Sequence, residues 1–136
     1  MVPCTLRVIY GDTDQMGVVY YANYLRWFEA GRTEFLRAKG LSYSDFEARE
    51  KLILPVVEAG VTYRQPARYD DLVAVETRLA EARRASARFA YDVRRGADLL
   101  ATGFTLHACV NGAGRIERLP REFLDKMKVG EEIVQA

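Results

Sequence analysis

The stretch that decides the fold is "YGDTDQMGVVYYANYLRW", residues 10–27. It begins where a strand-like segment, "CTLRVIY" (residues 4–10), ends, and turn-forming residues fill positions 11–17. From Tyr21 the apolar residues recur at helical spacing, which predicts a helix over residues 21–39 that ends at Gly40. Two carboxylates, Asp12 and Asp14, therefore stand directly before the start of a long apolar helix.

The remaining sequence predicts mainly strands. Residues 41–50 have the character of a short helix or turn, and Pro120 opens a second short helix over residues 121–128. Four strand-like runs lie between them, at residues 53–65, 72–82, 86–95 and 99–111. This order predicts an α+β fold, in which one helix covered on most sides packs on a curved antiparallel sheet whose strands are joined by short turns.

The last of these strands shows which residues are expected in the core. Its apolar alternation places Leu100, Phe104 and Leu106 on one face, together with Thr102, Ala108 and Val110. The chain of 136 residues is expected to form one domain, 1–136, with no second layer to cover the other face or the edges of the sheet. We therefore expect self-association into a homo-oligomer.

Composition excludes several classes of function. Lys and Arg number 20 against 19 Asp and Glu, a near-neutral balance that argues against nucleic-acid binding through a broad basic surface. No apolar run approaches a membrane span, and the N-terminal residues lack a signal-peptide core, so a cytoplasmic protein is expected. Cys4 and Cys109 are interpreted as reduced core thiols, and no Cys/His spacing predicts a metal site.

The opening stretch also carries a recognisable motif. "YGDTDQMGVVYYANYLRWFEAGR" resembles the 4-hydroxybenzoyl-CoA thioesterase family of hot-dog fold enzymes, including its YbgC-like acyl-CoA thioesterase branch. The resemblance continues in order at "LPVV", "PARYDDLVAVET", "EARRAS" and "GRIERLPREF", and so covers nearly the whole chain. It implies the hot-dog fold, a curved five-stranded antiparallel sheet wrapped around one long central helix.

The resemblance implies catalytic roles for two residues. Asp14 matches the family's carboxylate, which attacks the thioester carbonyl or activates water to do so. The backbone N–H of Tyr21 matches the group that holds the carbonyl oxygen, and a helix start suits a developing oxyanion. Gly17 and Val19 are expected beside the substrate, and Gly17 permits a tight turn there. The alternative for Asp14 is a cap or loop residue.

Two neighbouring residues have weaker assignments. Asp12 is interpreted as structural, because the family pattern gives it no direct role. Tyr10 is expected in the core or in the wall of the substrate pocket, with a catalytic part in some YbgC-like members. Many of those members carry histidine where this chain has Tyr21, and a phenol cannot replace it near neutral pH. This departure favours a mechanism that depends on Asp14 and the helix start.

Glu29 is the candidate for contact with the acyl group. The hydroxybenzoyl branch has an acidic residue here that meets the ring hydroxyl of its substrate. The alternative is a buried ion pair with Arg26 or Arg32, since a lone buried carboxylate is costly. Where that branch places a hydroxyl-bearing residue before the proline of "LPVV", this chain has Leu54, which favours a plainer acyl group.

Arg83 and Arg84 match basic residues that contact the phosphates of coenzyme A in the family, and guanidinium groups suit that task. The family's third basic position is Ala85 here, and the alternative is a solvated turn. His107, the only histidine, is expected to be a structural or surface residue of the last strand.

The sequence thus predicts an acyl-CoA thioesterase that needs no metal or cofactor, with coenzyme A entering only as part of the substrate. Short or medium aliphatic and aromatic acyl groups are expected, in a homotetramer with active sites between subunits. Two alternatives remain: a thioesterase that acts on acyl carrier protein, and a non-catalytic acyl-CoA-binding protein.

Overall fold

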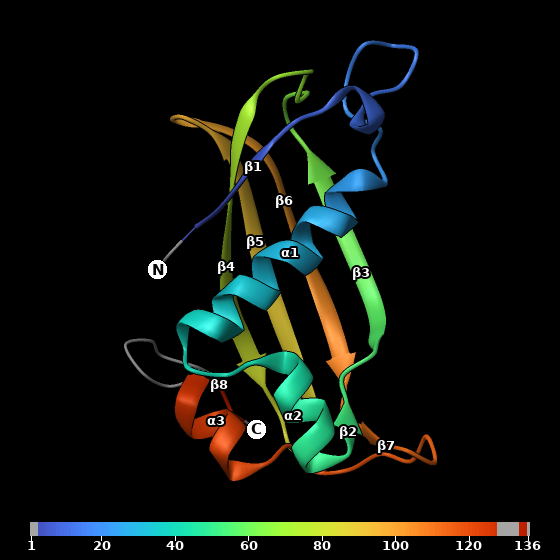
Figure 1. The fold of residues 1–136 in the computed structure, drawn as a ribbon, viewed down its shortest axis with the longest axis vertical. Coiled ribbons are helices and arrows are strands. Elements are labelled where there is room, and N and C mark those ends of the chain that lie inside the picture. The colour runs from blue at the N-terminus through green and yellow to red at the C-terminus, as the bar shows by residue number, and fades with distance from the viewer. Residues whose placement is uncertain (1–2, 128–133, 136) are drawn as a thin grey trace.

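The computed structural model describes residues 3–127 and 134–135. Figure 1 shows a twisted sheet crossed by a long helix, with shorter helices at one end. The elements in chain order are β1 (Cys4–Arg7), the 3-10 helix η1 (Tyr10–Asp12), α1 (Asn23–Ala38), α2 (Tyr43–Glu50), β2 (Leu52–Ile53), β3 (Val56–Tyr63), β4 (Leu72–Ala82), β5 (Ser86–Arg95), β6 (Asp98–Ala108), β7 (Val110–Asn111), α3 (Arg121–Met127) and β8 (Val134–Gln135).

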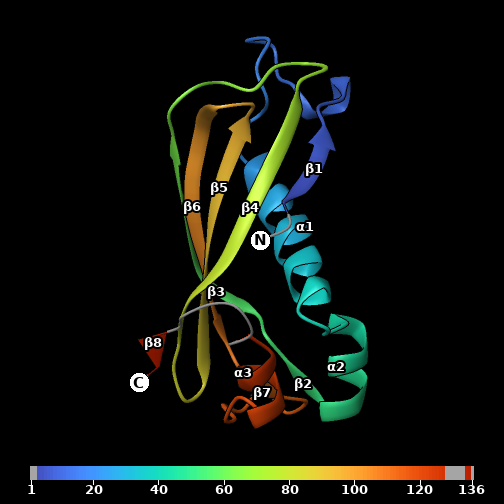
Figure 2. The same cartoon turned by 90° about the vertical axis from the view of Figure 1, so that its left-hand side faces the viewer.

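Five antiparallel strands form the main sheet, in the order β1-β4-β5-β6-β3. The short β8 adds to β4 in parallel, and β2 and β7 form a separate pair. Helix α1 lies against one face of the sheet (Figure 2), and the predicted α+β hot-dog architecture is confirmed. The expectation of short turns between consecutive strands is wrong for β3 and β4, because residues 64–71 carry the chain from one side of the sheet to the other.

The two faces of the sheet differ in character. Toward α1, the strands present alternate buried side chains such as Val75, Leu79 and Tyr91. The opposite face has no helix over it among the described residues (Figure 2), and it carries charge, including an ion pair between Arg94 and Glu76 at 2.9 Å. An outer face of this kind is polar at least in part, and the sheet edge is the second surface that the sequence leaves uncovered.

Helix α1 approaches the sheet closely because glycine stands at the crossing points. A Cβ atom at Gly31 would lie 2.7 Å from Cγ1 of Val75, and one at Gly103 would lie 2.4 Å from Cε2 of Phe28. The ring of Phe28 can therefore stack on Tyr91, with centroids 4.2 Å apart. The expectation that α1 is covered on most sides is wrong for the single chain, because Leu25 and Glu29 are exposed.

The same close approach corrects the predicted face of the last strand. In β6, Leu100 is buried as predicted, but farther along the strand the buried residues are Ala101, Thr105 and His107, whereas Phe104 and Leu106 are only half-buried on the other face. Small residues are needed opposite Phe28, so the larger apolar side chains point away from the helix. Within residues 3–127 and 134–135, no helix has the length and apolar character needed to cross a membrane.

Candidate active site

The loop between η1 and α1 folds into a tight turn that carries Asp14. The N–H of Asp14 donates to the carbonyl of Val18 at 2.9 Å, and the N–H of Gly17 donates to the carbonyl of Asp14 at 3.0 Å. Gly17 has a φ of +78°, a conformation that favours glycine. The carboxylate Oδ1 of Asp14 accepts from the N–H of Met16 at 2.8 Å. This bond closes an Asx turn, and it also fixes the direction of the half-buried Asp14 side chain.

Asp12 holds the base of the same loop. Its side chain is buried, and Oδ2 accepts from the N–H of Ile9 at 3.0 Å. Its carbonyl accepts from the N–H of Tyr20 and from Nδ2 of Asn23, both at 2.8 Å. These bonds join the end of β1 to the start of α1, which confirms the structural interpretation of Asp12.

The start of α1 lacks a side-chain cap. Ala22 occupies the cap position without a side-chain hydrogen bond, and the first turn contains no acidic residue. The N–H groups of Tyr21 and Ala22 donate to no acceptor among the described residues, whereas that of Asn23 donates to the carbonyl of Tyr20. The helix start therefore offers unused donors and the positive end of its dipole.

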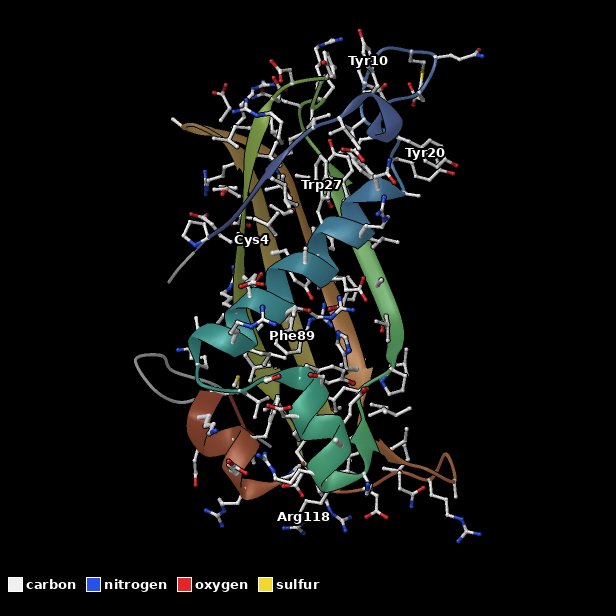
Figure 3. The ribbon with its side chains drawn as sticks, viewed as in Figure 1. Cys4, Tyr10, Tyr20, Trp27, Phe89 and Arg118 are labelled. Atoms are coloured by element: carbon white, nitrogen blue, oxygen red, sulfur yellow. The ribbon has the colours of Figure 1, made fainter. Side chains whose placement is uncertain are left out.

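These groups open into one cavity of about 270 Å³, which we call the helix-start cavity. Its lining includes Asp14, Val19 and Tyr21, three residues singled out from the sequence, together with Tyr24, Tyr63 and Pro66. Tyr20, at the end of the molecule that holds this loop, is labelled in Figure 3. Asp14 and Tyr21, whose N–H has no acceptor among the described residues, thus line one concave surface, an arrangement that suits acyl transfer.

Tyr63 is a member of the site that sequence reasoning did not identify. Its hydroxyl donates to the carbonyl of Tyr21 at 2.8 Å, which ties the helix start to the end of β3. Burial raises the pKa of Tyr63, with smaller contributions from Tyr24 and Tyr21, so the phenol stays protonated and donates. Positions 21 and 63 are 42 residues apart, and only the fold brings them together.

Two other predicted residues lie outside the lining of the helix-start cavity. Gly17 forms the turn beneath Asp14, and its carbonyl accepts from Arg68 at 3.4 Å. Tyr10 is exposed at the tip of the molecule (Figure 3) and stacks on Tyr69, with centroids 4.1 Å apart. The expectation that Tyr10 lies in the core or in the wall of the substrate pocket is therefore wrong for the single chain.

Arg83 and Arg84 lie in the turn between β4 and β5, at the opposite end of the sheet from the Asp14 loop (Figure 1). Both are exposed, and Arg83 is paired with Glu81. One chain does not bring these residues to the helix-start cavity, and their contact with coenzyme A stays a prediction.

Glu29 lines a second cavity of about 230 Å³ between α1 and the start of β3, which we call the inner cavity. Arg32, Tyr43, Leu54, Phe89 and His107 also line it, and Figure 3 shows Phe89 midway along the molecule. The expected burial of Glu29 is wrong in the single chain, where its side chain is exposed. Nor does it form the alternative ion pair with Arg26 or Arg32 within the described part of the chain.

Residues 8–127 match the family described as the thioesterase-like superfamily. The chain belongs to this superfamily. It is similar to the acyl-CoA thioesterase YbgC of Haemophilus influenzae, with 36% identity over 106 residues that cover 78% of each chain. The resemblance inferred from the opening motif is confirmed.

Solved structures of similar proteins agree with this membership. The crystal structure of the hypothetical protein TT1821 from Thermus thermophilus superposes with a TM-score of 0.89 and 43% identity, covering 95% of this chain and 98% of that one. A 4-hydroxybenzoyl-CoA thioesterase mutant complexed with 4-hydroxybenzoyl-CoA has a TM-score of 0.84 over 93% of this chain and 98% of that one. Its identity is 23%, so this second likeness is one of fold alone.

His107 of this thioesterase-like chain is a buried structural residue, and the surface alternative is wrong. Its Nδ1 lies 2.8 Å from the carbonyl of Leu54, and its Nε2 lies 2.8 Å from Oγ1 of Thr105. Burial, and then the charge of Arg32, lower the pKa of His107, so the ring is neutral near pH 7 although the bond to Leu54 opposes the shift. In residues 3–127 and 134–135, no group of His, Cys, Asp and Glu side chains could hold a metal ion.

Proposed function

We propose that the protein hydrolyses acyl-CoA thioesters in the helix-start cavity. The observation that carries the proposal is the meeting of the half-buried Asp14 carboxylate with an uncapped helix start in one cavity. The membership in the thioesterase-like superfamily supports the reaction class. Short or medium aliphatic and aromatic acyl groups are the substrates that this proposal includes.

The chemistry needs one carboxylate and one oxyanion site. Asp14 either attacks the thioester carbonyl itself or takes a proton from an attacking water. In both routes the carbonyl oxygen gains negative charge, which the N–H of Tyr21 stabilises. The carbon–sulfur bond then breaks, and the coenzyme A thiolate takes up a proton that comes from water. If Asp14 attacks directly, water next hydrolyses the acyl–Asp14 anhydride, which releases the free acid and restores the carboxylate; if Asp14 acts as a base, the attacking water supplies the hydroxyl of the acid. The protonated phenol of Tyr63 contributes by holding the peptide of Tyr21 in place.

The group that carries the acyl chain is proposed to be coenzyme A, with Arg83 and Arg84 near its phosphates. Their exposed guanidinium groups suit this role, but they lie far from Asp14 in one chain, so a second copy must supply them. Replacing Arg84 with alanine should then raise KM for acyl-CoA and leave kcat unchanged. An equal effect on the same acyl group carried by acyl carrier protein would contradict a role in nucleotide binding.

Two copies are proposed to pair through β3. This strand bonds to β6 on one side only, and no described strand lies on its other side. Its apolar residues are exposed, with Val57 at 60% and Tyr63 at 46%. Antiparallel pairing centred between Ala59 and Gly60 would satisfy the free edge and would place Val56 of one copy opposite Tyr63 of the other. The predicted tetramer would join two such pairs.

The test is a screen of coenzyme A esters with short, medium, branched and aromatic acyl groups, in which a thiol reagent reports free coenzyme A. The proposal predicts release from at least one class, and slower release when the same acyl group is carried by acyl carrier protein. Faster hydrolysis of the carrier-bound acyl group would overturn the assignment of coenzyme A. Binding of acyl-CoA without any thiol release would identify a binding protein instead of an enzyme.

A further inference from the structure

The inner cavity lies away from Asp14 and has its own chemistry. Helix α1 supplies Glu29 and Arg32 to its wall, the turn before β3 supplies Leu54, and the sheet supplies Phe89 and His107. At about 230 Å³ the cavity exceeds the ~150 Å³ that accommodates a benzene ring in an apolar protein interior. It can therefore receive the end of an acyl group.

The histidine in this wall has no hydrogen-bonding capacity left for a ligand. A carbonyl can only accept, so Nδ1 of His107 donates to Leu54, and Nε2 must accept from the hydroxyl of Thr105. The hydroxyl of Thr105 is then the acceptor in its 2.5 Å bond with Tyr91. One chain of bonds, all in the same direction, therefore runs from the hydroxyl of Tyr91 through Thr105 and His107 to the carbonyl of Leu54.

Tyr43 is also engaged. Its hydroxyl accepts from the N–H of Leu54 at 2.8 Å. Burial is the main cause that raises its pKa to about 12, so the phenol keeps its proton. His107 and Tyr43 thus use their hydrogen-bonding groups on neighbouring protein atoms. The charged side chains in the lining of the inner cavity are Arg32 and Glu29.

Arg32 keeps donors to spare. It is half-buried, and no carboxylate lies within ion-pair distance of it in the described part of the chain. A guanidinium has five N–H donors and no acceptor. Arg32 lies close enough to His107, Tyr91 and Tyr43 for its charge to act toward a lower pKa in each, although the carboxylate of Glu47 acts in the opposite direction on Tyr43. Arg32 thus brings a positive charge to the wall of the inner cavity.

We propose that the inner cavity binds a carboxylate at the far end of the acyl group, with Arg32 as the residue that determines this specificity. The substrates of this class are monothioesters of dicarboxylic acids. A guanidinium can bind a carboxylate through two parallel hydrogen bonds. A half-buried cation that lacks a protein anion is stabilised when such a carboxylate binds. This inference rests on the proposed thioesterase function.

The pairing through β3 explains how the acyl group reaches Arg32. Positions 21 and 32 are eleven residues apart, about 16 Å along a helix, which is too far for a short acyl group within one chain. Tyr63 lines the helix-start cavity and Val56 lines the inner cavity. If Val56 of one copy lies opposite Tyr63 of the other, the inner cavity of one copy adjoins the helix-start cavity of its partner.

The experiment compares kcat/KM for pairs of coenzyme A esters of equal chain length that end in a methyl, a hydroxyl or a carboxylate. We expect the carboxylate ester to be preferred at one length. The variant Arg32→Gln should lower the carboxylate-to-methyl ratio about tenfold to a hundredfold, whereas Arg32→Lys should retain part of the preference. Glu29→Gln should raise the ratio, because it removes a like charge. Arg26→Gln is the matched control, since Arg26 lies on α1 outside both cavities and should leave the ratio unchanged.

A preference for methyl or hydroxyl ends at every length, or an unchanged ratio in Arg32→Gln, would overturn the proposal while thiol release continued to support the thioesterase. Co-purified heterodimers of Asp14→Asn and Arg32→Gln subunits test which copy supplies Arg32. In such a heterodimer the intact Asp14 belongs to the Arg32→Gln subunit, and the intact Arg32 belongs to the other subunit. The carboxylate preference is kept if Arg32 acts across the interface, and it is lost if Asp14 and Arg32 act within one chain. Binding of the three esters to Asp14→Asn should show the same order of affinity without turnover.

Discussion

The two cavities differ in how much of the hydrogen-bonding capacity of their polar groups is used within the protein. In the helix-start cavity, the N–H of Tyr21 has no acceptor among the described residues, and Asp14 uses one carboxylate oxygen in the bond from Met16. At the inner cavity, His107 in the wall bonds to Thr105, and Thr105 bonds to Tyr91, so these strand residues use their capacity on one another. The first arrangement leaves groups free to act on a substrate. The second stabilises the core and leaves Arg32 without a carboxylate partner in the part of the chain that the structure describes.

Removing His107 should have the largest effect on stability. His107→Leu leaves the carbonyl of Leu54 without its donor and the hydroxyl of Thr105 without its acceptor. Burying two unsatisfied groups should lower the free energy of unfolding by about 3 kcal/mol, measured by urea denaturation. His107→Gln, which can donate and accept, should recover part of the loss. A change below 0.5 kcal/mol, as for an ordinary surface substitution, would show that the chain of bonds does not stabilise the core.

The pH dependence of stability isolates the same residue, because the chain has one histidine. Burial lowers the pKa of His107 in the folded state, while the unfolded state keeps a value of about 6.5. Below about pH 6.5 the unfolded state therefore binds more protons than the folded state. The stability that the neutral His107 contributes is fully present above about pH 6.5, and it is lost as the pH falls toward the pKa of the folded state. Between pH 7 and pH 5, the wild type should lose more stability than His107→Gln. Parallel curves would contradict a buried neutral imidazole.

Replacing Asp12 tests the structural aspartate of the catalytic loop. Asp12→Ala removes the acceptor for the N–H of Ile9 and should lower the free energy of unfolding by about 1–2 kcal/mol. Activity should fall by less than about tenfold, because the carboxylate that reacts stays in place. Urea denaturation and thiol release measured on one preparation check both values. A total loss of activity without loss of stability would assign chemistry to Asp12.

The smallest effect is expected at Tyr63. Tyr63→Phe removes one partly exposed hydrogen bond to the carbonyl of Tyr21 and should cost about 0.5–1 kcal/mol. If this bond positions the helix start, kcat should fall about threefold while KM stays constant. An unchanged kcat would restrict Tyr63 to the cavity wall.

Sequence alone could predict the features that depend on neighbours in the chain. The helix after Tyr21, the structural Asp12 and the meeting of Asp14 with a helix start follow from local spacing and from the family motif. Features that join distant strands could not be predicted. The donor from Tyr63, the bonds of His107 and the cation in the inner cavity depend on the strand order, in which β3 lies beside β6 rather than β4. The apolar pattern predicts the wrong core face for the middle of β6, because Gly103 stands against Phe28 there and the pattern indicates larger residues.

The most direct test of the account is the rate of coenzyme A release by Asp14→Asn, with the acyl group that the wild type hydrolyses fastest. The asparagine keeps the Oδ1 acceptor for the N–H of Met16 and so preserves the turn. The account predicts a fall in kcat of about a thousandfold, with the free energy of unfolding unchanged within about 0.5 kcal/mol and acyl-CoA still bound. Wild-type kcat in a folded Asp14→Asn protein would contradict the central claim, because the charge of Asp14 would then have no part in the reaction.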